Sequence, residues 1–410
     1  MTAKQMERCR QRLQTYLAEM LTPVGRSERR YWGSVYVRGL LLNGERKSVG
    51  AMATRLPEAN EQNLQQFLSQ SPWAWEPVWQ ALAERIESSF PAPQAWVIED
   101  TSFPKKGEHS VGVQRQYCGA LGKKANCQVA VSLHRTDAGG SSPLGFRLYL
   151  PEVWTDDRNR CRQAGVPDQV RFQKKWELAV ELIDQALAWG ARKPEAVLAD
   201  SAYGDNGALR RALEQRGLAY AVAVHQDGVV WTEPPTYKVP AAPRAPGPQP
   251  TRISYGDQRP LTLREVAEEN RLRFRPLTWR EGAKGPLRSR WWAGRVQTAW
   301  HWQEGEEPGP PLWLLIEWPK EEPEPTKYYL CDLPEKLSRK RLVQIARGRW
   351  RVERDYQQMK EELGLDHFEG RSWTGWHHHV TLVMLAHLFL RLEQKRRRSK
   401  RTLDTARNAA

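Results

Sequence analysis

The sequence predicts an α/β protein: a mixed sheet flanked by helices, with a helical domain before it and a β-rich insertion within it. Three observations support this prediction. Residues 94–225 alternate between short apolar runs and amphipathic helical stretches, as in a sheet covered by helices. Residues 1–93 show helical spacing throughout. Residues 226–333 open with a proline-rich segment and continue as alternating stretches, after which helical spacing returns.

Length and charge narrow the range of functions. The chain has 410 residues, a net charge of +15 and a pI of about 9.7. This length accommodates two or three domains, and this charge predicts an anionic partner, with nucleic acid first. The longest apolar run, residues 380–390, is too short to span a bilayer, so no membrane partner is expected. Five scattered cysteines without C-x-x-C spacing predict neither disulfides nor a zinc site, which fits a cytoplasmic protein.

The domain at residues 1–93 is expected to contain several short helices. Residues 5–21 are amphipathic, and residues 49–56 and 61–69 form two further helical stretches. Asn60 is placed to cap the second of these. Two short helices joined by a tight turn are compatible with a helix-turn-helix that enters a DNA major groove. A helical bundle that supports the rest of the chain is the alternative, and the sequence leaves both open.

The region from residue 94 to residue 225 is expected to form the first part of a catalytic domain. Its predicted strands are 96–99, 127–134, 145–150, 196–199 and 220–224, and its predicted helices are 169–189 and 206–216. This order of elements is similar to that of the RNase H-like fold.

The region from residue 226 to residue 333 is predicted to be an insertion of antiparallel strands. Its expected strands are 261–263, 288–300, 311–318 and 327–330. The insertion holds eight of the chain's 19 tryptophans, namely Trp231, Trp279, Trp291, Trp292, Trp300, Trp302, Trp313 and Trp318. Core packing is the ordinary role of such residues, and stacking on nucleic-acid bases is the alternative. The sequence does not indicate which tryptophan would stack.

Residues 334–393 are predicted to be helical again. Apolar residues at helical spacing predict a buried stripe, formed by Leu342, Ile345, Val352, Met359 and Leu363. A second helix is expected at about 379–394. Residues 394–410 form a basic tail, and from Arg391 onward the chain carries a net charge of +6. Such a segment is typically solvated, and it is also suited to binding DNA phosphates.

Three acidic residues are the candidate catalytic and metal-binding residues. Asp100 and Asp200 each follow an apolar run, so each is expected to end a buried strand, where the backbone holds a carboxylate rigidly. Glu353 lies within a helical pattern. Two divalent ions about 3.5–4 Å apart require hard oxygen ligands of this kind and catalyse in-line displacement at phosphorus. The sequence therefore predicts phosphoryl transfer on nucleic acid.

The helix around Glu353 is expected to present cations beside this carboxylate. At about 100° per residue, Arg349, Glu353 and Lys360 fall within roughly 40° of one another, whereas Asp355 and Glu362 turn away. Such a face combines a metal ligand with two groups that can bind phosphate. An i,i+4 salt bridge between Arg349 and Glu353 is the structural alternative.

These residues resemble those of the DDE transposases of bacterial insertion sequences, in the branch marked by Y-x2-R-x3-E-x6-K. Mapped onto this chain, the pattern falls on Ala346, Arg349, Glu353 and Lys360. Three of the four positions match, and alanine replaces the tyrosine. Asp100 with Thr101 resembles the first aspartate block of the family. The run Asp-Ser-Ala-Tyr-Gly from residue 200 resembles the second, and a long β-rich insertion before the glutamate is also typical.

The resemblance implies that Asp100, Asp200 and Glu353 hold two Mg²⁺ or Mn²⁺ ions. It implies cleavage at transposon ends and strand transfer into target DNA, in a cut-and-paste reaction for which hairpin ends are one route. The implied partner is double-stranded DNA, both the terminal inverted repeats and the target. A homodimer in the DNA complex and a bacterial cytoplasmic location at the nucleoid are also implied. A nuclease that never joins strands and a non-catalytic DNA-binding regulator are the alternatives.

Two further groups of residues bear on DNA binding and on metal binding. Lys105, Lys106 and Arg115 follow the first aspartate in a glycine-containing segment. They are expected to contact DNA phosphates, with a solvated basic loop as the alternative. Three consecutive histidines at 377–379 do not predict a metal site, because consecutive helical residues point in different directions.

Overall fold

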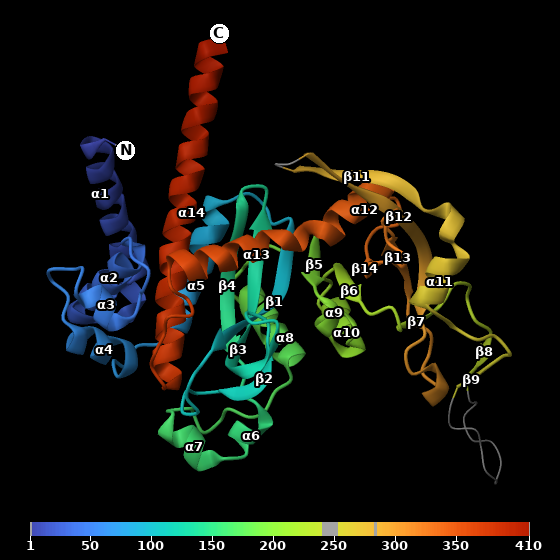
Figure 1. Ribbon diagram of the computed structural model, residues 1–410, viewed down its shortest axis with the longest axis horizontal. Helices are drawn as coiled ribbons and strands as arrows, with labels where there is room; N and C mark the ends of the chain where they lie inside the picture. The colour runs from blue at the N-terminus through green and yellow to red at the C-terminus, as the bar shows by residue number, and fades with distance from the viewer. Residues whose placement is uncertain (1, 240–252, 283–284, 410) are drawn as a thin grey trace. The chain divides into compact units, whose positions relative to one another are not determined.

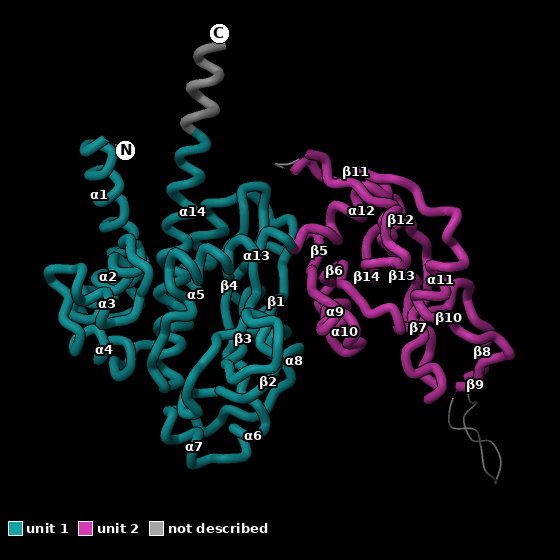
Figure 2. Tube along the Cα trace, viewed as in Figure 1, with its two compact units in different colours: residues 1–194, 350–410 teal, residues 195–349 magenta. Residues whose placement is uncertain are grey.

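The protein consists of two compact units. The computed structural model describes residues 2–239, 253–282 and 285–409, with side chains described as far as Ser399. Unit 1 comprises residues 1–194 and 350–410, and unit 2 comprises residues 195–349 (Figure 2). The predicted domain borders after residues 93, 225, 333 and 393 stay a prediction.

Unit 1 begins with helices and ends with helices (Figure 1). Its helices are α1 (Ala3–Met20), α2 (Ser27–Leu41), α3 (Val49–Ala53), α4 (Glu61–Ser69), α5 (Glu76–Ser89), α6 (Glu152–Thr155), α7 (Arg158–Gln163), α8 (Lys175–Ala188), α13 (Trp350–Gln357) and α14 (Trp373–Ala409). Helix α4 has the predicted bounds, and the Asn60 side chain accepts a hydrogen bond from the Asn63 backbone N at 3.1 Å, so the predicted cap is confirmed.

Four antiparallel strands form the sheet of unit 1. They are β1 (Ala95–Pro104), β2 (Gln114–Cys118), β3 (Lys123–Asp137) and β4 (Gly140–Leu148). Strand β3 pairs with β1 on one edge and with β2 and β4 on the other. Strand β2 was not predicted from the sequence. Strands β1 and β3 are longer than predicted, because polar residues continue both beyond their apolar runs.

Helices cover both faces of this sheet. On β4, Gly145 faces α8, since a Cβ at this position would lie 2.9 Å from the Leu182 side chain. The next residue, Phe146, faces α13, where its ring centroid lies 6.5 Å from that of Tyr356. Because successive strand residues point to opposite faces, α8 and α13 cover opposite faces of the sheet.

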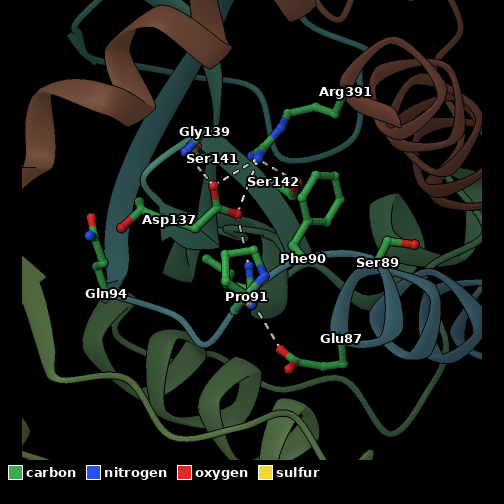
Figure 3. A network of polar contacts seen from close by, with 12 residues as sticks. Glu87, Ser89, Phe90, Pro91, Gln94, Asp137, Gly139, Ser141, Ser142 and Arg391 are labelled. Atoms are coloured by element: carbon green, nitrogen blue, oxygen red, sulfur yellow. Dashed lines mark hydrogen bonds and ion pairs between the residues drawn. The ribbon is translucent and has the colours of Figure 1, made fainter. Parts of the chain in front are cut away.

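A buried network of charged side chains joins α5, the β3–β4 turn and α14 (Figure 3). Arg391 of α14 donates hydrogen bonds to both carboxylate oxygens of Asp137, at 3.2 and 3.1 Å. Arg135 donates to the same carboxylate at 3.0 Å and to Glu87 at 3.0 Å. Arg391 was counted from the sequence as the first residue of the basic tail. It is instead buried and fully paired, so it is not available to bind phosphate.

Helix α14 starts earlier and ends later than the predicted helix at about 379–394. Within the described residues, no helix is both long enough and apolar enough to cross a lipid bilayer. The three consecutive histidines of α14 are buried and contact different parts of unit 1: His377 the Trp373 carbonyl, His378 the Leu68 and Trp73 carbonyls, and His379 the Tyr36 hydroxyl and the Gly364 carbonyl. They point apart, as expected from the sequence.

Unit 2 is built on a mixed sheet. Its strands are β5 (Ala196–Ala199), β6 (Tyr220–Val224), β7 (Val229–Trp231), β8 (Tyr237–Lys238), β9 (Ser254–Tyr255), β10 (Leu261–Thr262), β11 (Arg275–Gly282), β12 (Gly285–Thr298), β13 (Pro311–Glu317) and β14 (Lys327–Asp332). Its helices are α9 (Ser201–Gly204), α10 (Gly207–Gln215), α11 (Leu263–Glu269) and α12 (Arg339–Ala346). Strands β5 and β6 have the predicted bounds, whereas β11 and α11 were not predicted.

The strand order in unit 2 is β10-β7-β12-β13-β14-β6-β5, with β11 paired to β12. Strands β5 and β6 are parallel, and the other pairs are antiparallel. The predicted α/β class is therefore confirmed, together with the helical N-terminal part and the β-rich insertion. Of the eight tryptophans in the insertion, Trp231, Trp291 and Trp318 are buried. These three have the ordinary role of core packing.

Acid should destabilise unit 1 through His387, which is buried in α14 and whose ring nitrogens make no hydrogen bond with any described residue. Burial lowers the pKa of His387 to about 4, against the weaker opposing effect of Asp355. The unfolded chain binds a proton at this histidine near pH 6.5, so the stabilisation present above pH 6.5 is lost as the pH falls towards 4. Lowering the pH from 7 to 5 should therefore reduce the free energy of unfolding by up to about 2 kcal/mol through this one residue.

His387→Leu should reduce the loss of stability between pH 7 and pH 5, measured by urea unfolding at both values. His109→Leu is the matched control, because His109 is exposed and should leave the difference unchanged. An identical pH dependence in His387→Leu and the unmodified protein would contradict this account.

Candidate active site

Asp100 lies within a strand and not at its end. Strand β1 continues to Pro104, and Asp100 pairs with Val131 of β3. The prediction that Asp100 ends its strand was therefore wrong, because Thr101, Ser102 and Phe103 continue the pairing. The rigid placement expected of it still follows, since both neighbours in the strand are paired. The Asp100 carboxylate is 27% exposed and forms an ion pair with the Lys175 ammonium at the start of α8.

Glu353 lies in the first turn of α13 and is exposed. Val352, the preceding residue, is fully buried. The predicted apolar stripe is confirmed, because all of its members are buried: Leu342, Ile345, Val352, Met359 and Leu363. Glu353 is thus held on the outer side of a helix whose opposite side packs into a core.

Tyr356 connects the helix of Glu353 with the strand of Asp100. Its hydroxyl forms a hydrogen bond with the Ser132 hydroxyl of β3, one helical turn after Glu353. Ser132 pairs with Glu99 across the sheet, and its hydroxyl donates to the Glu99 carbonyl oxygen at 3.3 Å. Burial, and then the nearby carboxylates of Glu99 and Asp100, raise the pKa of Tyr356 well above its ordinary value. Tyr356 therefore stays a neutral hydroxyl next to the backbone that carries Asp100.

Asp355 anchors the same turn of α13 from a second direction. It is buried, accepts a hydrogen bond from the Ser141 hydroxyl of β4, and lies 3.6 Å from His134 Nδ1 and 3.8 Å from His387 Nε2. The prediction that Asp355 turns away from the face of Glu353 is consistent with this burial. Its role is to fix the helix, since its oxygens are occupied inside the protein.

Lys360 contacts strand β1 beyond Asp100. Its ammonium donates to the Ser102 carbonyl oxygen at 3.1 Å and lies 5.8 Å from the centroid of the Phe103 ring. Burial lowers its pKa. Tyr356 contacts Ser132 on β3, and Lys360 contacts Ser102 on β1. These two contacts fix the position of the helical segment on the sheet.

The expectation that Arg349, Glu353 and Lys360 share one face of a regular helix was wrong. Arg349 ends a 3₁₀ segment, Arg347–Arg349, and Lys360 lies in a π-helical segment, Gln358–Glu362. Only α13 between them is α-helical, so the rotation of 100° per residue does not apply across the whole span. The spacing of the motif is present, but it does not define one helix face.

Asp200 follows strand β5 directly, as predicted, and caps helix α9. Its side chain accepts a hydrogen bond from the Tyr203 backbone N at 3.4 Å. The guanidinium of Arg349, also in unit 2, lies 3.9 Å from the Asp200 carboxylate. A strand end, a helix cap and a cation thus hold this carboxylate.

Gly204 explains part of the Asp-Ser-Ala-Tyr-Gly run. A Cβ at this position would lie 1.8 Å from the backbone carbonyl oxygen of Ala223 on β6. Only glycine lets α9 approach this strand so closely, and Tyr203 is buried next to it. The two residues fix the turn that follows Asp200.

The three basic residues predicted to bind DNA lie in different environments. Lys106 and Arg115 are exposed. Lys105 is partly buried, donates to the backbone carbonyl oxygen of Phe368, and has a pKa lowered by burial. It lines a cavity of about 410 Å³ with Lys106, Asp366 and Glu369 among others. Lys106 and Arg115 are therefore the better placed of the three to meet a phosphate.

The three candidate carboxylates are divided between the units, with Asp100 and Glu353 in unit 1 and Asp200 in unit 2. Within either unit, the described residues contain no group of three or more His, Cys, Asp or Glu side chains arranged to hold a metal ion. Through Ser132, Tyr356 connects the helix that carries Glu353 with β1, the strand that carries Asp100. The convergence of all three carboxylates stays a prediction.

The fold and these residues define a class of protein that comparison with known families identifies. Residues 19–286, more than half of the chain, match the family described as DDE superfamily endonuclease. The chain belongs to this family. The matched segment includes Asp100 and Asp200 and ends before Glu353, whose assignment rests on the motif and on the contacts of Tyr356 and Asp355 in the same helix.

One relative is a transposase by name. The chain is 34% identical over 194 residues to the "Probable transposase for insertion sequence element IS701" of Microchaete diplosiphon. The alignment covers 47% of this chain and 48% of the relative, so the chain spans about half the length of the relative it matches. The resemblance to DDE transposases of insertion sequences, inferred from the motifs, is confirmed by both comparisons.

Sequence reasoning missed two residues of the site. Lys175 carries no signal in the sequence, because its contact with Asp100 joins residues 75 positions apart. Tyr356 lies three residues after Glu353, a spacing that places it on a neighbouring part of the helix surface. That spacing could have marked it as a contact between the helix and the sheet.

Gly204→Ala should destabilise the protein by about 1–3 kcal/mol, since the added methyl group meets a backbone carbonyl that cannot rotate away. Urea unfolding at neutral pH measures the change. Gly107→Ala is the control, because a Cβ there meets nothing within 4 Å. Equal stability of the two variants would show that α9 does not pack on β6 as described.

Tyr356→Phe and Ser132→Ala should each destabilise unit 1, and their effects should not add. Either substitution removes the same hydrogen bond, so a double-mutant cycle should give a coupling energy of about 1 kcal/mol. The free energy of unfolding of the two single variants and the double variant measures it. Additive effects would mean that the two hydroxyls do not interact.

Proposed function

We propose that this protein is a transposase that cleaves DNA at the ends of an insertion sequence and joins the freed 3′-hydroxyl to target DNA. The observation that carries the proposal is the contact between the helix of Glu353 and the strand of Asp100 through Tyr356, in a chain that belongs to the DDE endonuclease family. A glutamate on a helix that is fixed to an aspartate-bearing strand is a suitable arrangement for a shared metal site.

Asp100, Asp200 and Glu353 are the proposed ligands of two Mg²⁺ or Mn²⁺ ions. Their carboxylates supply only hard oxygen donors, as these ions require, and all three are at least partly exposed. The two aspartates each contact a cationic side chain, Lys175 or Arg349. When bound, the ions would activate the attacking hydroxyl and stabilise the departing oxygen at phosphorus.

The other residues of the site orient the DNA and the ligands in this proposal. Tyr356 and Asp355 hold the turn of Glu353, so they are positioning residues. Arg349, Lys106 and Arg115 provide cations for phosphate oxygens, and Lys360 and Lys105 would do so after exchanging their carbonyl contacts. A cut-and-paste reaction, hairpin ends, a homodimer on the DNA and action at the nucleoid follow from the branch of the family that the motif resembles.

Glu353→Gln should abolish cleavage while preserving the fold, because the amide keeps the shape of the side chain and loses the negative charge that a metal ligand needs. Mg²⁺-dependent cleavage of duplex DNA carrying the inverted repeats that flank the gene should fall by roughly a hundredfold or more. Glu361→Gln is the matched control, because Glu361 is an exposed glutamate eight residues later, in the π-helical segment, and its carboxylate accepts hydrogen bonds from Gln357 among the described residues.

Undiminished cleavage by purified Glu353→Gln would refute the assignment of this residue. Strand transfer is tested separately with precut ends and a supercoiled target. Hydrolysis without joining would indicate a nuclease, and DNA binding without cleavage under Mg²⁺ or Mn²⁺ would indicate a regulator.

A further inference from the structure

The hairpin formed by β2 and the start of β3 extends past the end of the neighbouring strand in unit 1. The pairing of β1 with β3 ends at Pro104, opposite Cys127. Strand β2 pairs with residues 123–127 of β3, so the part of β3 before Asn126 is paired with β2 alone. We call residues 114–127 the basic ribbon.

The two faces of the basic ribbon differ in character. Cys118 and Cys127 are fully buried and pack against Val129, which anchors one face to the body of the unit. Tyr117 lies directly opposite Lys124, and Arg115 is two residues before Tyr117 on the same strand. Paired residues and residues two apart share a face, so Arg115, Tyr117 and Lys124 project together from the other face.

This outer face combines cations with exposed apolar groups. Tyr117 is 65% exposed and Leu121, in the turn, is 48% exposed. The side chains of Arg115, Tyr117 and Lys124 make no hydrogen bond or ion pair with any residue that the structure describes. In the same unit, Lys175 and Lys360 both have protein partners. An exposed aromatic ring between cations is a suitable surface for an anionic polymer with apolar faces.

Charge is concentrated in the segment that contains the ribbon. Residues 104–126 include five Lys or Arg and one acidic residue, Glu108. The Asn126 side chain donates to the carbonyl oxygens of Lys105 and Gly107, at 3.0 and 2.8 Å, and so holds the preceding basic loop against the ribbon. The cations of the loop and of the ribbon therefore belong to one surface.

We propose that the basic ribbon binds in the major groove of duplex DNA. This groove is wide enough for a two-stranded β-ribbon. Arg115 and Lys124 contact phosphates, while Tyr117 and Leu121 make apolar contacts with base edges in the groove. The inference rests on the proposed function, because it supplies the DNA on which the site acts.

The distance along β1 fits one duplex contacting both the site and the ribbon. Asp100 lies four residues before Pro104, which is paired with Cys127 of the ribbon, and this separation corresponds to roughly 13 Å of extended strand. At 3.4 Å per base pair, that length is roughly four base pairs of DNA. The ribbon would therefore hold DNA beside the phosphodiester that reacts, without contacting it.

The test measures the binding of a 40-base-pair duplex in EDTA, where no cleavage takes place, over a series of salt concentrations. Arg115→Ala with Lys124→Ala should weaken binding and reduce the slope of log affinity against log salt by roughly 1.8, since each lost phosphate contact contributes roughly 0.9. Tyr117→Ala should weaken binding roughly tenfold with an unchanged slope, because the ring carries no charge.

Lys320→Ala with Lys327→Ala is the matched control. Both lysines are exposed, lie outside the ribbon, and stand near Glu321, Glu322 and Glu324. The control removes the same charge and should leave the slope as in the unmodified protein. Urea unfolding of each variant ensures that a change in binding does not reflect loss of the fold.

An unchanged slope in the Arg115/Lys124 double variant would overturn the proposal, as would an equal change in the control. Unaltered affinity of Tyr117→Ala, or ribbon-dependent binding that is tighter to a single strand of 40 nucleotides, would also overturn it. The proposed function is tested by a different result. If the proposed function is wrong, Glu353→Gln retains cleavage, whatever the DNA affinity of the ribbon variants.

Discussion

The burial of two consecutive polar side chains of α13 is the constraint on which the arrangement of the site depends. Asp355 and Tyr356 enter the interior of unit 1, where unpaired polar groups are costly. Each finds a hydroxyl on the sheet, Ser141 on β4 and Ser132 on β3. Because these partners are on fixed strands, the helix has one favourable rotation and one favourable position along them. The rotation and the position of the helix together determine where Glu353 lies.

Sequence patterns predicted the bounds of the elements whose ends are marked by a cap or by a change from apolar to polar residues. The bounds of α4, β5 and β6 agree with the structure, because Asn60 caps α4 and polar residues follow the apolar runs of β5 and β6. Strand β1 was cut short at Asp100, where apolar residues give way to Thr101 and Ser102. Backbone pairing with β3 continues there regardless of side-chain polarity. Strand β2 is short, half-exposed and polar, so nothing in its composition separates it from a loop.

The sequence predicted which residues belong to the candidate site, but it did not predict how they are arranged. The motif spacing pointed to Glu353, and its family context pointed to Asp100 and Asp200. The helical-face argument failed because the chain changes from 3₁₀ to α to π geometry between Arg347 and Glu362, which a fixed rotation per residue does not anticipate. Contacts over long separations, such as that of Lys175 with Asp100, arise only from tertiary packing.

The pairing of each candidate aspartate with a protein cation separates folding from metal loading. Lys175 and Arg349 compensate the charges of Asp100 and Asp200, so neither unit has to trap an isolated anion as it folds. Small metalloproteins that lack such compensation assemble only around their ion. In the proposed site, an incoming divalent ion would displace an ammonium or a guanidinium, so its affinity would be a difference between two electrostatic attractions. That exchange would release two cationic side chains beside the bound metals, where an anionic substrate could take them up.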